Sequence, residues 1–97
     1  MITLYTKTPC PYCDQAKHYL KGISEEYREI NIMENENARE WLIQQGHKTV
    51  PQIYYEGKIL VEGGYTGLSK VTAEELQERK RAIREGWYQQ SNDTKTY

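Results

Sequence analysis

Two cysteines separated by two residues are the side chains of this sequence best suited to chemistry. Cys10 and Cys13 enclose a proline and a tyrosine, and a pair at this spacing can form and release a disulfide by thiol–disulfide exchange. The pair lies between a short β-type run, residues 2–5, and a segment with helical spacing, residues 11–21. We therefore expect Cys10 at the N-cap of a helix and Cys13 one turn further in, where it is more buried.

The start of a helix favours a thiolate at Cys10. The first backbone N–H groups of a helix lack partners within it, and the helix dipole is positive there. Pro11 suits the first helical position because its missing N–H costs nothing there, and Lys7 adds a nearby cation. We expect the pKa of Cys10 to fall from about 8.5 into the range of about 3.5–7.5. Since a lower pKa also weakens the nucleophile, the main gain is that Cys10 leaves a mixed disulfide easily.

Two other uses of the cysteine pair are weaker. Half of a zinc site would need two further ligands, and neither His18 nor His47 stands at a suitable spacing, so we expect both on the surface. A structural disulfide suits an oxidising compartment, whereas the N-terminus lacks the basic and apolar regions of a signal peptide. We therefore predict a redox role in a cytoplasmic protein, with no metal bound.

Composition predicts a folded domain with a tyrosine-rich core. The 97 residues include nine Tyr, two Trp and no Phe, so buried hydroxyl groups must find hydrogen-bond partners. A formal net charge of −1 argues against nucleic-acid binding, and no apolar run is long enough to span a membrane. We expect a monomer with one domain over residues 1–90 and a frayed polar tail over residues 91–97.

Apolar spacing predicts strands over residues 2–5 and 27–32 on either side of the helix at residues 11–21. Gly22 stands where the C-terminal cap of that helix belongs. Asn35 can cap a second helix, which Gly46 closes. The expected inward positions of the first helix are Tyr12, Ala16, Tyr19 and Leu20. The second helix carries Ala38, Trp41, Leu42 and Gln45.

The second half of the chain predicts a hairpin and a last helix. Strands over residues 52–55 and 58–61 are joined by Glu56 and Gly57. Thr72 and Glu75 form a capping box for a helix to about residue 88, with Leu76, Ile83 and Trp87 facing inward. Its residues 79–81 are basic but interleaved with glutamates, which indicates a solvated face. The order β-α-β-α-β-β-α predicts an α/β fold with a four-stranded mixed sheet.

Three blocks of this sequence make it similar to a known family. They are YTKTPCPYC at residues 5–13, TVPQI at residues 49–53 and GGYT at residues 63–66. In this order and at these separations the chain resembles a glutaredoxin up to about Leu68. The resemblance implies a thioredoxin fold with a cis bond between Val50 and Pro51, next to the cysteines. From its position alone, Pro51 would be interpreted simply as the first residue of a strand.

The resemblance also implies a glutathione site. Val50 would pair with the cysteine backbone of glutathione, Gly63 and Gly64 would receive the γ-glutamyl carboxylate, and Lys7 would hold another carboxylate. Without the resemblance, the two glycines would be an ordinary turn, Lys7 would be solvated and Tyr12 would belong to the core. The implied site residues are Lys7, Tyr12, Thr49, Val50, Pro51, Gly63, Gly64, Tyr65 and Thr66.

Two features depart from the family. Gly67 stands where members often have an aspartate, so a carboxylate that would pair with the γ-glutamyl ammonium group is missing. The highly charged last helix is longer than the usual family ending. Residues 30–33 and the small size resemble phage-encoded glutaredoxins.

The implied activity is glutathione-dependent thiol–disulfide exchange. Cys10 attacks a protein disulfide or a glutathionylated protein, Cys13 resolves the mixed disulfide, and two glutathiones reduce the oxidised pair. Ribonucleotide reductase is a client that the resemblance suggests. The alternatives are a thioredoxin-like reductant recharged by a flavoprotein, and an iron–sulfur carrier that holds a cluster through Cys10 of two protomers and two glutathiones.

Overall fold

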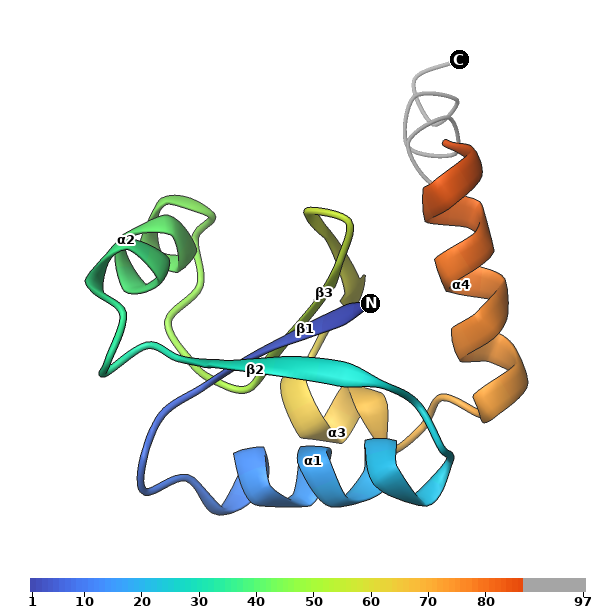
Figure 1. The fold of residues 1–97 in the computed structure, drawn as a ribbon, viewed down its shortest axis with the longest axis horizontal. Helices are drawn as coiled ribbons and strands as arrows, with labels where there is room; N and C mark the ends of the chain where they lie inside the picture. Colours follow the sequence, from blue (N-terminus) through green and yellow to red (C-terminus); the bar gives the residue numbers. More distant parts are fainter. Residues whose placement is uncertain (87–97) are drawn as a thin grey trace.

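A four-stranded mixed sheet flanked by helices forms the body of the protein, in a computed structural model that describes residues 1–86 (Figure 1). The elements in chain order are β1 (Ile2–Thr6), α1 (Pro11–Gly22), β2 (Tyr27–Asn31), α2 (Glu36–Gln44), β3 (Gln52–Tyr55), β4 (Lys58–Val61), α3 (Gly64–Leu68) and α4 (Ala73–Glu85). The sheet order is β2-β1-β3-β4. Strands β1 and β2 are parallel, while β3 is antiparallel to both β1 and β4. The predicted α/β class and mixed sheet are confirmed.

The helices lie on both sides of the sheet. Figure 1 shows α1 and α3 next to each other on one side of the strands and α2 on the other, with α4 at the β4 end. The main core lies between the sheet and the helices α1, α3 and α4. Its buried members are Ile2, Leu4, Ala16, Leu20, Ile53, Tyr55, Leu60, Val61, Leu68, Val71, Leu76 and Ile83.

A smaller aromatic cluster covers the side of the sheet that faces α2. Alternate residues of a strand point to opposite faces, so Tyr5 and Tyr54 point away from the main core and meet Trp41 of α2. The ring centroids of Trp41 and Tyr54 are 5.0 Å apart, and Tyr5 lies 5.8 Å from each. Burial raises the pKa of Tyr5 despite the opposing field of Arg28. The prediction that tyrosines replace phenylalanine in the packing is confirmed.

Helix α1 ends differently from the prediction. Gly22 lies inside the helix, and the left-handed residue after its end is Ser24, with φ 59°. The N–H groups of Ser24 and Glu25 donate to the carbonyl oxygens of Lys21 and Leu20, at 3.0 and 2.9 Å. This pair of bonds is a Schellman motif. It allows the half-buried Ile23 to pack against the core.

Two features of the last third of the chain also differ from the prediction. The glycine pair opens the short helix α3 instead of a plain turn, with φ 87° at Gly63 and 60° at Gly64. Helix α4 has the predicted capping box but ends at Glu85, because Gly86 takes the left-handed conformation, with φ 81°. The predicted inward position of Trp87 and the predicted tail, residues 91–97, lie outside the described residues.

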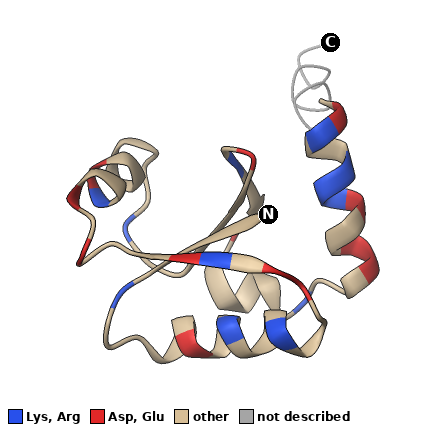
Figure 2. Ribbon diagram, in the orientation of Figure 1, with Lys and Arg blue, Asp and Glu red and all other residues tan. Residues whose placement is uncertain are grey.

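The charged face of α4 is not fully solvated, contrary to the prediction. Figure 2 shows acidic residues in the first turns of this helix, basic residues further along it and an acidic residue at its end. Lys80 forms an ion pair with the buried carboxylate of Glu25, which also accepts a hydrogen bond from Gln77 at 2.8 Å. Arg84 donates to the Tyr55 hydroxyl at 3.0 Å, and this bond raises the pKa of the guanidinium. Part of the charge on α4 therefore contacts the rest of the protein and holds the helix in place, rather than facing solvent.

Within residues 1–86, no helix is both long enough and apolar enough to cross a membrane.

Candidate active site

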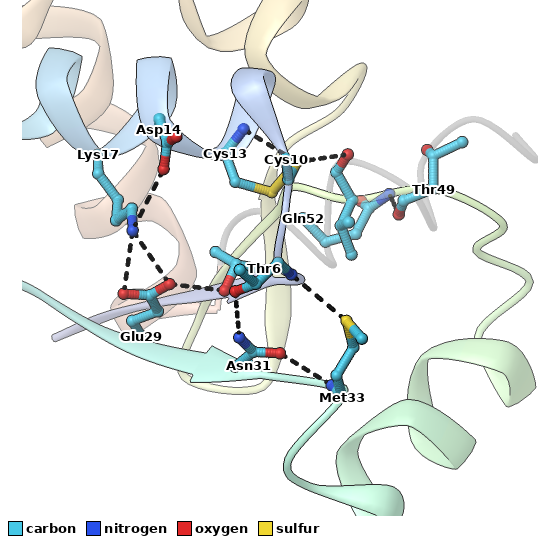
Figure 3. Close-up of a disulfide and its surroundings, with 12 residues drawn as sticks. Thr6, Cys10, Cys13, Asp14, Lys17, Glu29, Asn31, Met33, Thr49 and Gln52 are labelled. Atoms are coloured by element: carbon cyan, nitrogen blue, oxygen red, sulfur yellow. Dashed lines mark hydrogen bonds and ion pairs between the residues drawn. A yellow bond between two sulfur atoms is a disulfide. The ribbon is translucent and has the colours of Figure 1, made fainter.

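The two cysteines form a disulfide across the first turn of α1 (Figure 3). Cys10 is the N-cap with an extended backbone, and Pro11 occupies the first helical turn, as predicted. The Sγ atom of Cys10 accepts a hydrogen bond from the Cys13 N–H at 3.1 Å. Cys10 is 8% exposed and Cys13 only 1%, so the expected difference in burial is confirmed. An incoming group can therefore reach Cys10 more readily than Cys13.

The loop before Cys10 is tied to the end of β2. The peptide bond between Thr8 and Pro9 is cis. The hydroxyl of Thr8 accepts a bond from Asn31 Nδ2 at 2.8 Å, and its N–H donates to Met33 Sδ at 3.4 Å. Asn31 Oδ1 accepts from the Met33 N–H at 2.9 Å. These contacts could not be predicted from the sequence, since polar residues in loops have many possible partners.

A polar cluster joins β1, β2 and α1 near Cys13 (Figure 3). The fully buried hydroxyl of Thr6 donates to Glu29 Oε2 at 2.7 Å, and Lys17 Nζ lies 3.3 Å from the same oxygen. The Thr6 bond and Lys17 lower the pKa of Glu29, against the effect of burial. Burial alone would lower the pKa of Lys17, but Glu29 and Asp14 outweigh it and raise that pKa. No pattern in the sequence predicts this cluster.

The segment before β3 lies against the cysteines. The bond between Val50 and Pro51 is cis, as the family resemblance implied. The carbonyl oxygen of Val50 is 3.9 Å from Cys10 Sγ, although residue 50 follows the cysteine by forty positions in the chain. Gln52 Nε2 donates to the Thr49 carbonyl oxygen at 2.8 Å and thereby holds the strand entry in place.

A groove of about 490 Å³ opens along this segment, and we call it the first groove. It brings together every residue predicted for glutathione except Lys7. Its lining comprises Tyr12, His47, Thr49, Val50, Pro51, Gln52, Ile59, Glu62, Gly63, Gly64, Tyr65 and Thr66. Tyr12 is 60% exposed, so its predicted inward position on α1 is wrong, and Cys13 takes that inward place instead.

Lys7 lines a neighbouring second groove of about 220 Å³. The two grooves share His47, Thr49 and Val50. The complete lining of the second groove is Lys7, Ile32, Arg39, Leu42, Ile43, His47, Lys48, Thr49 and Val50. Because Val50 belongs to both grooves, a ligand that pairs with its backbone can reach into either.

His47 is not a free surface residue, contrary to the prediction. Gly46 takes the left-handed conformation at the end of α2, as predicted, and the His47 N–H bonds to the Leu42 carbonyl oxygen at 3.0 Å. This turn directs the half-buried imidazole to the Tyr54 hydroxyl, 2.6 Å from Nε2. His18 is exposed, as predicted.

Gly67 has a structural reason to lack a side chain. A Cβ atom on Gly67 would lie 1.8 Å from the carbonyl oxygen of Glu62, far inside contact distance. The missing carboxylate at this position therefore has a steric reason, because a side chain on Gly67 would require the backbone to shift. Gly64 is similarly constrained, because it combines φ 60° with a Cβ position only 3.2 Å from the Pro51 carbonyl oxygen.

Among residues 1–86, no three or more His, Cys, Asp and Glu side chains gather as they would around a metal ion.

The sheet order, the helix with its N-terminal dithiol and the adjacent cis-proline define a protein of the thioredoxin-like class. Residues 2–60 match the Glutaredoxin family. The chain belongs to the glutaredoxin family, and with its Cys-x-x-Cys pair it is a thiol–disulfide oxidoreductase.

Two curated relatives illustrate the match. Glutaredoxin 3 of Escherichia coli K12 is 38% identical over 58 residues, which cover 59% of this chain and 70% of the relative. A glutaredoxin-like 8.6 kDa protein of Clostridium pasteurianum is 29% identical over 80 residues, covering 81% of this chain and 100% of the relative.

Solved structures support the same fold. The thioredoxin-like protein BC3987 has a TM-score of 0.60 at 25% identity, covering 81% of this chain and 99% of its own. Glutaredoxin C1 from Populus tremula x tremuloides has a TM-score of 0.65 at 24% identity, with coverages of 82% and 75%.

Proposed function

We propose that this protein is a glutathione-dependent oxidoreductase that reduces protein disulfides and glutathione mixed disulfides. The observation that carries the proposal is the position of Val50, whose carbonyl oxygen lies 3.9 Å from Cys10 Sγ and whose backbone borders both grooves. An exposed strand entry of this kind can pair with the backbone of a short extended peptide. A cysteine in that peptide then lies next to Cys10.

Cys10 is the attacking cysteine in this proposal. Its thiolate attacks the glutathione sulfur of a mixed disulfide, the old S–S bond breaks, and the client leaves as a thiolate that takes up a proton. A second glutathione thiolate then attacks the sulfur of the Cys10-bound glutathione and releases Cys10 and glutathione disulfide. With a protein disulfide, Cys13 attacks the Cys10 sulfur of the mixed disulfide, which frees the reduced client and leaves the pair oxidised.

Glutathione would extend along both grooves. Its γ-glutamyl carboxylate would meet the backbone N–H groups at Gly63 and Gly64, its cysteine would pair with Val50, and its glycine carboxylate would approach Lys7. Tyr12 would flank the bound tripeptide. A buckwheat glutaredoxin solved as a glutathione complex shares the fold, with a TM-score of 0.65 at 22% identity over 82% of this chain and 76% of its own. That complex supports glutathione as the proposed ligand.

A thioredoxin-like reductant, recharged by a flavoprotein reductase, is the second candidate. The observation in its favour is the similarity to the E. coli glutaredoxin-like protein NrdH-redoxin, whose activity profile is described as thioredoxin-like. It is 28% identical with a TM-score of 0.55, over 56% of this chain and 71% of its own. In addition, Gly67 stands where family members often have an aspartate, so the chain lacks a carboxylate that would pair with the γ-glutamyl ammonium group of glutathione.

A paired assay separates the two candidates. The protein is incubated with a glutathionylated peptide and NADPH, either with glutathione and glutathione reductase or with thioredoxin reductase alone. We expect NADPH oxidation only in the glutathione arm. Turnover only with thioredoxin reductase would overturn the proposal. Visible absorbance of anaerobically purified protein, in turn, would favour the iron–sulfur carrier.

Three further features belong to the proposal: a cytoplasmic location, a monomeric state and ribonucleotide reductase as a client. Reduction of an oxidised ribonucleotide reductase by the glutathione-coupled protein would test the last of these.

A further inference from the structure

The connection between β1 and Cys10 lies at the surface of the protein. Its residues 7–9 are all exposed, and they carry the backbone from the end of the sheet to the N-cap of α1. At this cap Cys10 has an extended backbone, with φ −158° and ψ 96°, and its Sγ atom accepts the bond from the Cys13 N–H. Contacts that fix the connection therefore contribute to the geometry of the redox site.

A closed ring of three hydrogen bonds ties this connection to the end of β2. Asn31 Nδ2 donates to the Thr8 hydroxyl at 2.8 Å, and the Thr8 N–H donates to Met33 Sδ at 3.4 Å. The Met33 N–H donates in turn to Asn31 Oδ1 at 2.9 Å, and Figure 3 shows the side chains of Asn31 and Met33 beside the connection. Each of the three residues thus donates one bond of the ring and accepts another.

Asn31 is the member of the ring that is anchored best. It is half-buried, whereas Thr8 and Met33 are exposed. Its backbone is the last residue of β2, in register with Thr6 at the end of β1, and the Ile32 N–H continues this pairing with a bond of 2.8 Å to the Thr6 carbonyl oxygen. A thioether sulfur is a weak acceptor, whereas an amide both donates and accepts well. The Asn31 amide therefore provides most of the tie.

We propose that Asn31 is a positioning residue for the redox reaction, and that it acts through Thr8 on the connection that sets Cys10 at the start of α1. The inference rests on the proposed role of Cys10 as the attacking cysteine. When the Asn31 amide is lost, the connection gains freedom, and the bond from the Cys13 N–H to Cys10 Sγ is formed for a smaller part of the time. Because that bond favours the thiolate, the ionisation of Cys10 should respond to a substitution in β2.

The pKa of Cys10 tests the proposal, measured by the ultraviolet absorbance of the thiolate in proteins that all carry Cys13→Ser. A hydrogen bond to a charged group corresponds to about 1–2 pKa units, so its partial loss in Asn31→Ala should raise the pKa of Cys10 by about 0.5–1 unit. Thr8→Val removes the hydroxyl that accepts from Asn31 and should raise this pKa by a similar amount. The two shifts should not add in the double variant, because both substitutions break the same bond.

Two further substitutions separate the bonds of the ring. Asn31→Ser keeps an oxygen that can accept from the Met33 N–H, but its side chain is too short to donate to Thr8, so its effect on the pKa of Cys10 should match that of Asn31→Ala. Met33→Leu should have a smaller effect, because a sulfur accepts only weakly. Thr8→Val and Asn31→Ser decide the question if Asn31→Ala does not fold.

Asn35→Ala is the matched control for a general loss of stability. Asn35 caps α2 by accepting from the Ala38 N–H at 3.0 Å, so its loss should lower the melting temperature but leave the pKa of Cys10 unchanged.

Three outcomes would contradict the inference or its basis. A low pKa of Cys10 that neither Asn31→Ala nor Thr8→Val changes would overturn the inference alone. An equal shift in Asn35→Ala and Asn31→Ala would also overturn it, because the effect would then follow general stability. An ordinary pKa of about 8.5 in the Cys13→Ser parent, together with no exchange on a glutathionylated peptide, would overturn the proposed role of Cys10 itself.

Discussion

The backbone N–H of Cys13 donates a hydrogen bond of 3.1 Å to the Sγ atom of Cys10. This is the bond that an N-cap side chain accepts at the start of a helix, and here a sulfur takes the place of the usual oxygen. A thiolate accepts such a bond more strongly than a thiol. The bond therefore favours the ionised form of Cys10 once the disulfide is reduced.

This geometry predicts unequal roles for the two cysteines. Cys10→Ser should abolish exchange with a glutathionylated peptide. Cys13→Ser should retain that exchange, because the backbone N–H remains, but should lose the reduction of protein disulfides. The ultraviolet absorbance of the thiolate in Cys13→Ser should give a pKa for Cys10 below about 7.5. Similar loss of peptide exchange in both variants would contradict the assignment.

Glu29 should make the folded state sensitive to acid. Its pKa is lowered by the hydrogen bond from Thr6 and by Lys17. A lowered folded-state pKa gives stability that is present above the ordinary value of 4.5 and is lost as the pH falls through the folded value. Glu29→Gln should lower the free energy of unfolding by about 1 kcal/mol at pH 7, after allowance for partial exposure.

Denaturant unfolding from pH 7 down to about pH 3 tests this prediction. The stability of Glu29→Gln should depend less on pH than that of the wild type in the acidic range, and the two should converge at the lowest pH. Glu34→Gln, at an exposed position, is the control. Parallel pH profiles for the wild type and Glu29→Gln would rule out the proposed role of the Thr6 bond.

Substitution of Gly67 should destabilise the protein. A Cβ atom would overlap the Glu62 carbonyl oxygen, so the backbone of α3 or of the preceding loop must move. Gly67→Ala and Gly67→Asp should each lower the free energy of unfolding by about 1–3 kcal/mol, the usual range for overpacking. Gly67→Asp should consequently bind glutathione no better than the wild type.

Gly22 provides the matched control for Gly67. It lies in the last turn of α1 with open space at its Cβ position, so Gly22→Ala should leave stability unchanged or raise it by up to about 1 kcal/mol. Equal thermal stability of Gly67→Ala and Gly22→Ala would contradict the steric explanation, in which a Cβ atom on Gly67 overlaps the Glu62 carbonyl oxygen.

Ser24 should be replaceable by glycine with a gain in stability. Its φ of 59° is left-handed, a conformation that glycine adopts without the steric cost of a Cβ. Ser24→Gly should raise the free energy of unfolding by about 0.5–1 kcal/mol, because the left-handed cost of about 1–2 kcal/mol for a residue with a Cβ exceeds the extra backbone entropy of about 0.5–1 kcal/mol that glycine loses on folding. Chemical denaturation measures this gain. Ser69→Gly should have the opposite effect, because Ser69 has φ −64° and its hydroxyl donates to the Thr66 carbonyl oxygen at 2.9 Å. A loss of stability in Ser24→Gly would contradict this account.

Apart from the short helix α3, which was not predicted, the order of elements could be predicted because it depends on local patterns. Cys10 and Asn35 cap their helices as predicted, and Thr72 and Glu75 form the expected capping box. The hairpin has the predicted strands, with Glu56 at φ 51° in its tight turn. Caps and turns involve residues a few positions apart, so their partners can be recognised in the sequence.

Packing against the core, rather than the local signal, set the end of α1. Gly22 carries the expected signal for the end of α1, yet it still belongs to the helix. Ile23 packs against the core, and Ser24 takes the left-handed conformation in place of Gly22. Packing against the core decided this end, and the local signal could not show it.

By itself, then, the sequence determined the redox pair, its place at the start of a helix and the order of every element except α3. Only the tertiary structure decided which distant side chains complete the site. Thr6 meets Glu29 and Lys17, His47 meets Tyr54, and Gly67 contacts the Glu62 backbone. Polar side chains and glycines carry no periodic signal, and their partners are fixed by how the strands and helices pack.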